Sequence, residues 1–85
     1  RWEQLQSDHE KMRYLYKRWL EKEIRAGYAF KPHLTPNETK ADFYAQKKFD
    51  VNREWAERVV DGYNETRYGG RPPASETLEK WKGEL

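Results

Sequence analysis

The sequence contains no cysteine, so it forms no disulfide, offers no thiolate nucleophile and has no Cys-type zinc site. A small secreted domain often needs disulfides, and their absence favours a reducing compartment. The sequence also lacks any run of 18 or more apolar residues, so no segment of it is expected to span a membrane. It shows no signal-peptide pattern, and it begins at Arg1 rather than at a methionine. We therefore expect a domain excised from a longer parent protein.

Residues that carry catalysis or bind metals are also scarce. Histidine occurs only at His9 and His33, which lie in different segments and lack metal-ligand spacing. Serine occurs only at Ser7 and Ser75, and neither lies in a Gly-x-Ser-x-Gly turn. The single Gly-Gly pair lacks the spacing and the trailing Lys-Ser/Thr of a phosphate-binding loop. We therefore expect no enzyme activity, no cofactor and no metal.

Aromatic and charged residues are abundant instead. Four Trp, six Tyr and three Phe in 85 residues supply large rings for the dense core that so small a domain needs. Charged residues make up 38% of the chain, with both signs interspersed and a net charge of +2. This mixture is typical of a solvated helical surface rather than of a charged tail. Residues 1–85 are expected to form a single domain.

Residues 2–26 show the periodicity of one long amphipathic helix. Leu5, Met12 and Trp19 recur at seven-residue intervals along it. No Gly or Pro interrupts the segment before Gly27, which predicts the end of the helix there. The same near-heptad row suits self-association as well. Packing within the chain and pairing with a second copy therefore stay open as alternatives.

The stretch "LTPNE" predicts the start of a second helix, over residues 36–47. Thr35 is the expected N-cap, Pro36 suits the first helical position, and Glu38 completes a Thr-x-x-Glu capping box. The rings of the preceding "YAFKPH" stretch are expected to fold back onto the helices. The residues predicted to point inward from the second helix, with Phe43 on its flank, are Ala41, Tyr44 and Ala45.

A third helix is predicted over residues 52–68, with Asp50 or Asn52 as its cap and the Gly69-Gly70 pair as its stop. Its uninterrupted apolar row consists of Trp55, Ala56, Val59, Val60 and Tyr63. After the "RPP" corner, Ser75 is expected to cap a short last helix. The apolar face of that helix comprises Leu78, Trp81 and Leu85. Together these segments predict an all-α fold, a compact bundle of about four helices without strands.

The tripeptide "NET" occurs twice, at Asn37 and at Asn64, and each copy has the form of an N-glycosylation acceptor. Such acceptors suit surface loops of secreted proteins. Asn37 instead falls in the first turn of the predicted second helix, and Asn64 falls within the third. We therefore expect neither asparagine to carry a glycan.

Nucleic-acid binding is one alternative that the basic isoelectric point of about 8.9 raises. The basic residues around the junction of the second and third helices and beyond it are Lys47, Lys48, Arg53, Arg58, Arg67 and Arg71. The acidic residues interleaved with them are Asp50, Glu54, Glu57 and Asp61. Because phosphates repel a helix that carries so many carboxylates, nucleic acid is the less favoured partner.

The most distinctive stretch is "YNETRYGGRPP". It places Tyr63, Arg67 and Tyr68 within one helical turn of one another, ahead of the Gly-Gly stop and Arg71. An arginine in this position can stack on a neighbouring ring or reach carbonyls at the helix end. The group is interpreted as a structural clasp that closes the third helix onto the fourth, or as a docking patch for a partner.

Two motifs together resemble a known family. "LTPNETKADFYA" is similar to the Thr-Pro-x-Glu helix start, and "YNETRYGG" to the Tyr-x-x-x-Arg-Tyr-Gly signature, of a bacterial domain of unknown function. The order of the segments matches over most of the 85 residues. The residues that match the family pattern are Thr35, Pro36, Glu38, Tyr63, Arg67, Tyr68 and Gly69. Asn37 departs from it, at a position where a basic residue is expected.

The resemblance implies a function for the chain. That family closes the C-terminal end of membrane-anchored proteins, many with an extracytoplasmic transglutaminase-like domain and a membrane helix before it. The chain would then be the soluble tail on the cytoplasmic side of a bacterial membrane, where no N-glycan is added. Transglutaminase-like chemistry needs a Cys nucleophile, so that activity cannot reside here.

We therefore predict a non-catalytic protein-interaction or regulatory tail of such a protein. Its partner would be another protein or the rest of the parent chain, and it would meet the membrane only through a transmembrane segment of the parent. The alternatives are a nucleic-acid-binding helical module and a structural cap or dimerisation domain.

Overall fold

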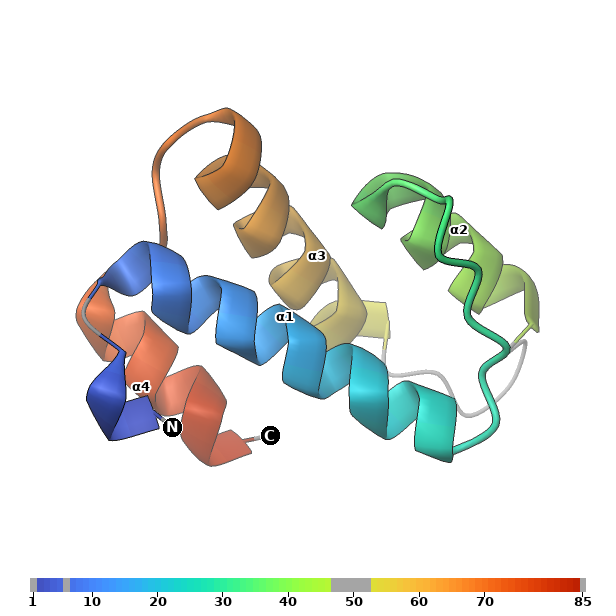
Figure 1. Ribbon diagram of the computed structural model, residues 1–85, viewed down its shortest axis with the longest axis horizontal. Coiled ribbons are helices and arrows are strands. Elements are labelled where there is room, and N and C mark those ends of the chain that lie inside the picture. The colour runs from blue at the N-terminus through green and yellow to red at the C-terminus, as the bar shows by residue number, and fades with distance from the viewer. Residues whose placement is uncertain (1, 6, 47–52, 85) are drawn as a thin grey trace.

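Four α-helices and a short 3-10 turn make up the described part of the chain (Figure 1). The computed structural model describes residues 2–5, 7–46 and 53–84. In chain order the elements are η1 (Trp2–Gln4), α1 (Asp8–Arg25), α2 (Pro36–Gln46), α3 (Arg53–Tyr68) and α4 (Ser75–Glu84). These residues contain no strand, so the predicted all-α class with four helices is confirmed.

Helix α1 is the central element of the bundle. It packs against α3 and against α4, while α2 packs on α3 (Figure 1). The α4 contact involves the N-terminal half of α1, where Lys11 Nζ lies 3.6 Å from a carboxylate oxygen of Glu79. None of the described helices is long and apolar enough to cross a bilayer.

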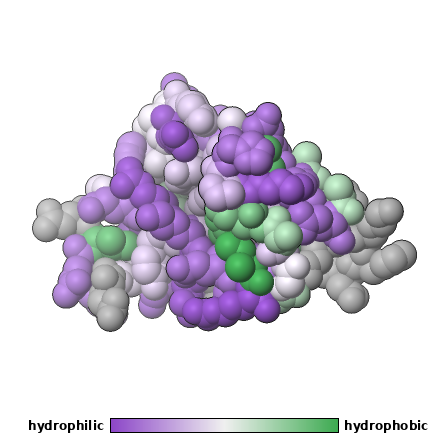
Figure 2. Space-filling model, turned by 45° about the vertical axis from the view of Figure 1, so that its right-hand side comes forward, coloured by the Kyte–Doolittle hydropathy of each residue, from purple (hydrophilic) through white to green (hydrophobic). Residues whose placement is uncertain are grey.

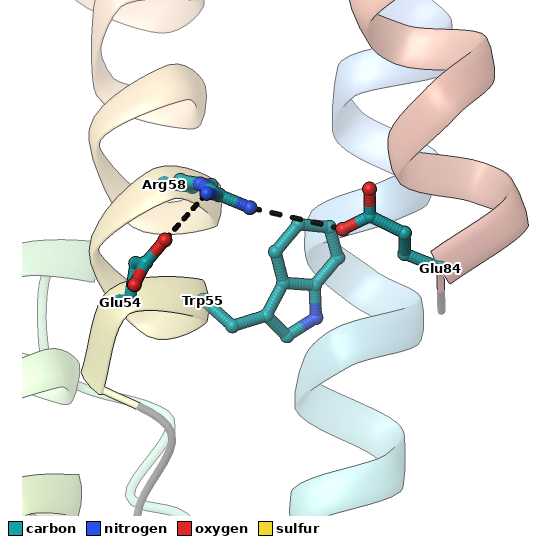
Figure 3. A pocket seen from close by; sticks show the side chains of 4 residues that line it. All are labelled: Glu54, Trp55, Arg58 and Glu84. Carbon is teal, nitrogen blue, oxygen red and sulfur yellow. Dashed lines mark hydrogen bonds and ion pairs between the residues drawn. The ribbon is translucent and has the colours of Figure 1, made fainter.

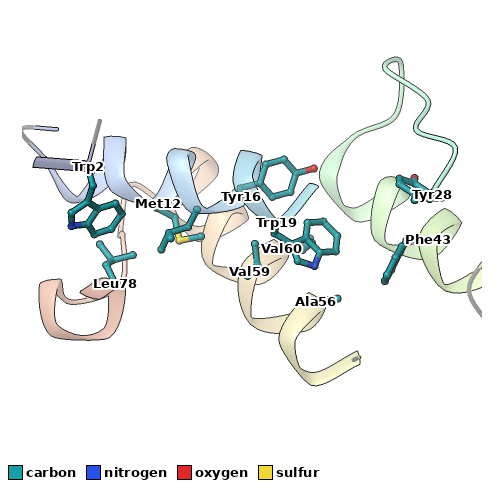
Figure 4. Packing of buried hydrophobic residues seen from close by; sticks show 11 residues of the cluster. Trp2, Met12, Tyr16, Trp19, Tyr28, Phe43, Ala56, Val59, Val60 and Leu78 are labelled. Carbon is teal, nitrogen blue, oxygen red and sulfur yellow. The ribbon is translucent and has the colours of Figure 1, made fainter. Parts of the chain in front are cut away.

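The core is one cluster of apolar side chains drawn from all four helices (Figure 4). Its buried members are Trp2, Met12, Leu15, Tyr16, Trp19, Tyr28, Phe43, Ala56, Val59, Val60 and Leu78. Met12 and Trp19, from the near-heptad row, are 0% and 2% exposed, and Leu5 packs against the cluster from outside α1. Met12 and Trp19 of this row therefore pack within the single chain.

The predicted start of the first helix at Trp2 is wrong. Residues 2–4 form the 3-10 turn, and α1 begins at Asp8 because Ser7 acts as its N-cap in an extended conformation. The Ser7 hydroxyl oxygen accepts the backbone N–H of Glu10 at 3.2 Å, as in a Ser-x-x-Glu capping pattern. The break lets Trp2 fold back, so that its ring meets Tyr14 edge to face at a centroid distance of 5.7 Å.

The predicted end of the first helix at Gly27 is confirmed. Gly27 has a φ of 111°, a conformation that costs glycine little because it has no Cβ. Its N–H donates to the carbonyl of Ile24 at 3.1 Å, and the N–H of Tyr28 donates to the carbonyl of Glu23 at 2.9 Å. This pair of bonds is the Schellman arrangement, which satisfies carbonyls that the helix end leaves free.

The loop after α1 turns its rings inward, as predicted. Tyr28 is 2% exposed and meets Phe43 edge to face at 5.5 Å, while Phe30 is half-buried. The Tyr28 hydroxyl donates to Asp42 at 2.9 Å, and Lys31 Nζ donates to the same carboxylate at 2.7 Å. Burial raises the pKa of Tyr28, and the Lys31 ammonium lowers the pKa of Asp42. These contacts fix the loop to α2.

The predicted capping box at the start of α2 is present in full. The hydroxyl of Thr35 accepts the N–H of Glu38 at 3.2 Å, and the Glu38 carboxylate accepts the N–H of Thr35 at 2.9 Å. Two of the donors that the helix start leaves free are thereby satisfied. Local structure thus explains the Thr-Pro-x-Glu motif on which part of the family resemblance rests.

A Glu38→Gln variant is expected to be less stable than the wild type at neutral pH, and this difference in stability should disappear at acidic pH. The backbone N–H of Thr35, followed by its hydroxyl, lowers the pKa of Glu38 below its ordinary value of 4.5. A carboxyl with a lowered pKa contributes stability above its unfolded-state pKa and loses it as the pH falls through the folded-state value. The urea midpoint of the wild type should exceed that of the variant at pH 7, and the gap should close towards pH 3. An equal gap at both values would contradict this linkage.

The predicted inward face of the second helix is wrong for its two alanines, whereas Tyr44 does pack against the core cluster. Thr39 and Phe43 are buried, at 1% and 2% exposure, whereas Ala41 and Ala45 are exposed. Tyr44 is half-buried. The apolar residues of α2 do not gather on one side, so the sequence pattern could not select the face that meets α3. The helix ends at Gln46, and the expected last residue, Lys47, lies outside the described residues.

Helix α3 confirms the predicted apolar row and stop. Ala56, Val59 and Val60 are fully buried, and Gly70 after the helix has a φ of 69°. Its predicted caps, at positions 50 and 52, lie outside the described residues. Helix α4 begins at Ser75 itself rather than after it, because the carbonyl before Ser75 accepts the N–H of Leu78 at 3.0 Å. Leu78 is buried and Trp81 half-buried as predicted, while Leu85 lies outside the described residues.

Candidate functional site

Tyr63 of the distinctive stretch packs against α1. Its ring stacks on the ring of Tyr16 with a centroid distance of 4.2 Å and an interplanar angle of 6°. We expected this residue to help close the third helix onto the fourth, but its ring contact joins α3 to α1 instead. Burial raises the pKa of Tyr16, against a smaller opposing effect of the positive charge of Arg67.

The other members of this stretch lie on the surface. The Arg67 guanidinium lies 5.4 Å from the ring centroid of Tyr68, which is 66% exposed. Arg71 is exposed, and its backbone N–H donates to the carbonyl of Glu65 at 3.1 Å. That carbonyl also accepts the N–H of Gly69 at 2.9 Å. The Gly-Gly stop therefore turns Arg71 away from the axis of α3 and leaves Arg67 and Tyr68 accessible.

A groove of about 500 Å³ lies between α1 and the C-terminal half of α3. We call it the α1–α3 groove, and the residues that line it are His9, Arg13, Tyr63, Thr66 and Arg67. His9 and Arg13 are four residues apart on α1. On α3, Thr66 and Arg67 follow Tyr63 by three and four residues. These spacings place each set on one face of its helix. The packing of α1 on α3 then brings the two faces together.

The electrostatics of the groove are unbalanced towards positive charge. Within the described residues, neither Arg13 nor Arg67 forms an ion pair, and none of the described lining residues is acidic. By contrast, Lys40 on α2 lies 2.9 Å from Glu57 and 3.3 Å from Asp61. The two groove guanidinium groups thus keep their hydrogen-bond donors for another molecule.

Two further lining residues set what the groove can do chemically. His9 lines the groove, and its Nδ1 atom is enclosed and has no hydrogen-bond partner within the described part of the chain. The Thr66 hydroxyl donates to the carbonyl of Gly62 at 2.8 Å, which commits its proton to its own helix. The groove therefore offers positive charge and hydrogen bonds rather than an activated nucleophile.

A second pocket, of about 200 Å³, lies between α3 and the C-terminal end of α4 (Figure 3). Arg58 sits in it with its guanidinium paired to Glu54 and lying 3.7 Å from Glu84. The same guanidinium lies 5.8 Å from the ring centroid of Trp55, which in turn meets Trp81 edge to face at 5.9 Å. Because its cation is already neutralised, this pocket fastens α4 to α3 and does not attract an anion.

The basic residues considered for nucleic-acid binding do not form a described surface. Lys47 and Lys48 lie outside the described residues, and the side chain of Arg53 is not among those described. Arg58 is paired with two carboxylates. Arg67 and Arg71 form no ion pair within the described residues, but a duplex requires several phosphate contacts on one face. Nucleic acid thus stays the less favoured partner.

The two asparagines of the "NET" repeats bond to each other. Asn64 Nδ2 on α3 donates to Asn37 Oδ1 on α2 at 2.7 Å. A glycan on Asn64 would be attached through the nitrogen that makes this bond, and Asn64 is half-buried. The geometry gives these residues a structural role, which the sequence analysis did not foresee.

Sequence reasoning missed half of the α1–α3 groove. It singled out Tyr63 and Arg67, but it considered His9 only as a possible metal ligand and did not consider Arg13. The available signal was the spacing of His9 and Arg13 on one helix face, next to a row of apolar residues. That spacing becomes informative only once the packing partner of this face is known. The described residues also contain no group of three or more His, Asp or Glu side chains able to hold a metal.

Comparison with family models, with curated proteins and with solved structures finds no match to this chain. The resemblance drawn from the two motifs therefore remains a prediction.

Proposed function

We propose that this chain is a non-catalytic interaction domain that docks a partner protein through the α1–α3 groove and the adjoining Tyr68. In the setting that the two motifs suggest, it is the cytoplasmic tail of a membrane-anchored, transglutaminase-like bacterial protein, and docking regulates or localises that parent. The carrying observation is that Arg13 and Arg67 line one groove and form no ion pair within the described residues, while Tyr68, next to Arg67, is 66% exposed.

Composition supports an interaction surface at this place. Tyrosine and arginine are enriched among the residues that contribute most to protein–protein binding. Tyr68 is held against the Arg67 guanidinium, so both side chains lose little further freedom on binding.

The rest of the surface supports a polar mode of docking. Apart from Tyr68, the only other large hydrophobic side chain that is exposed among the described residues is Ile24, at 41%. The face drawn in Figure 2 is hydrophilic over most of its area, with hydrophobic surface limited to small patches. Such a surface favours a partner held by charge and a few aromatic contacts over a wide apolar interface.

The test is affinity capture with the folded domain as bait and with cytosol and solubilised membranes of the source cells as prey. An Arg67→Ala/Tyr68→Ala bait is expected to lose the partner, with affinity reduced by about tenfold or more, as for typical hot-spot residues. The control is Arg18→Ala, which removes an exposed arginine from α1 away from the groove. Circular dichroism checks that all baits are folded.

Three results would contradict the proposal. They are retention of the same partner by the double variant, equal loss with Arg18→Ala, and capture of nothing except nucleic acid that is released by salt.

A further inference from the structure

Three polar groups of the α1–α3 groove have no hydrogen-bond or ion-pair partner within the described residues. The guanidinium groups of Arg13 and Arg67 enter from different helices, and neither has an ion-pair partner among the described residues. His9 contributes an enclosed Nδ1 atom without a hydrogen-bond partner in the described part of the chain. A polar nitrogen shielded from solvent is usually hydrogen-bonded in folded proteins, and a ligand of the groove would supply such a partner.

We propose that the α1–α3 groove binds a phosphate monoester carried on a side chain of a partner protein. This inference rests on the proposed docking function and names the chemical group that the docking recognises. Arg13 and Arg67 would each donate hydrogen bonds to phosphate oxygens, and His9 would donate a further one.

The number and charge of these groups favour phosphate over a carboxylate. A carboxylate offers two oxygens and one negative charge, which a single arginine fork can satisfy. A phosphate monoester offers three oxygens and a charge of about −1.5 to −2 at pH 7. Two guanidinium groups match that charge, and together with the imidazole they match that number of acceptors. A carboxylate would use only one of the two guanidinium groups.

The position of the groove agrees with an anion at its α1 end. His9 is the second residue of α1, in the first turn of the helix, where the helix dipole favours negative charge. The negative charge of the Glu10 carboxylate opposes anion binding here. Glu10 lines a separate hollow together with Arg13. Glu10 does not line the groove itself, so its charge weakens the attraction without occupying the site.

The size of the groove favours a phosphate attached to a chain over the free ion. Its volume of about 500 Å³ lies within the range of ligand sites and exceeds what one phosphate fills. The neighbouring Tyr68 ring is 66% exposed and can contact residues that flank a phosphorylated side chain. A free phosphate would make no use of either feature.

The experiment is a titration of the ¹⁵N-labelled domain, followed by NMR. The probes are N-acetyl-Gly-phosphoserine-Gly-amide, the same peptide with serine or with glutamate in that place, and inorganic phosphate. We expect the phosphopeptide alone to bind in a saturable way and to shift the amide signals of His9, Arg13, Thr66 and Arg67. Arg13→Gln and Arg67→Gln should each weaken binding by about tenfold or more, because each removes a charge-assisted contact. The matched control, Arg18→Gln, makes the same change of net charge and should bind as the wild type does.

Each other outcome overturns the inference. Equal binding of the glutamate peptide means that the groove takes acidic side chains in general. Equal binding of inorganic phosphate means that it takes a free anion. Unchanged binding in the two groove variants, or no shift at groove signals, places the contact elsewhere.

Phosphatase treatment of the captured partner separates this inference from the proposed function. If the partner still binds through Arg67 and Tyr68 after treatment, docking stands and the phosphate inference fails. If no partner depends on these residues while the phosphopeptide binds in the groove, the proposed function fails instead.

Discussion

Replacing Trp19 with alanine is expected to lower the free energy of unfolding by about 3–5 kcal/mol, the usual cost of truncating a buried aromatic side chain. Trp19 is 2% exposed, and its ring meets Phe43 of α2 edge to face at 5.5 Å and Tyr16 at 6.0 Å. Its loss would leave a cavity where α1 meets α2. A domain of this size has a total stability of roughly 5–10 kcal/mol, so the variant would retain only a small margin. Urea unfolding followed by far-UV circular dichroism measures the effect.

The matched control for Trp19 is Ile24→Ala on the same helix. Ile24 is 41% exposed, and truncating it is expected to cost less than about 1 kcal/mol because less of its surface is removed from water on folding. Similar losses for the two variants would show that Trp19 is not the centre of the core.

Replacing Gly62 with valine is expected to destabilise the domain by about 1–2 kcal/mol. A Cβ atom at Gly62 would lie 3.0 Å from Met12 Sδ of α1 and 3.2 Å from a ring carbon of Trp81 of α4. The methyl groups of valine add to that crowding, and overpacking typically costs about 1–3 kcal/mol. The better helix propensity of valine offsets only about 0.5 kcal/mol of this. The readout is the urea midpoint at constant transition slope.

The control is Gly83→Ala on α4, for which we expect a change in stability of the opposite sign. A Cβ atom at Gly83 would meet nothing within 4 Å, so the helix gains propensity without a clash. The expected result is a stabilisation of about 0.5 kcal/mol. If both glycine variants stabilise the domain, then α1, α3 and α4 do not meet as closely at Gly62 as described.

The positions of three helix ends followed from the sequence. The Thr35 and Glu38 capping box, the Gly27 stop and the Gly69-Gly70 stop all depend on residues within a few positions of one another. Such local hydrogen bonds form in the same way whatever the rest of the chain does. The start of α1 could have been found by the same rule, because Ser7 and Glu10 have the spacing of a cap.

The inward face of α2 could not be read from the sequence in this way. Its buried side chains include Thr39, a polar residue, while two of its alanines face solvent. Tertiary packing overrode the hydrophobic pattern because α3 and the loop that carries Tyr28 determine which side of α2 is covered.

The candidate site was only partly within reach of sequence reasoning. Tyr63 and Arg67 stood out because they lie in one short, distinctive stretch. His9 and Arg13 lie some fifty residues earlier in the chain, and nothing local links them to that stretch. Only the contact between α1 and α3 makes them one groove.

By itself, the sequence determined that this protein is all-α with four helices. It also located those helix ends that a capping box or a glycine marks. These features depend on chemistry between near neighbours in the chain. The tertiary structure alone decided which helix faces meet. It paired Asn37 with Asn64, stacked Tyr63 on Tyr16 and made Arg13 and Arg67 line the same groove. The physical reason is that helix packing is chosen by the fit of whole surfaces, to which residues far apart in the sequence contribute together.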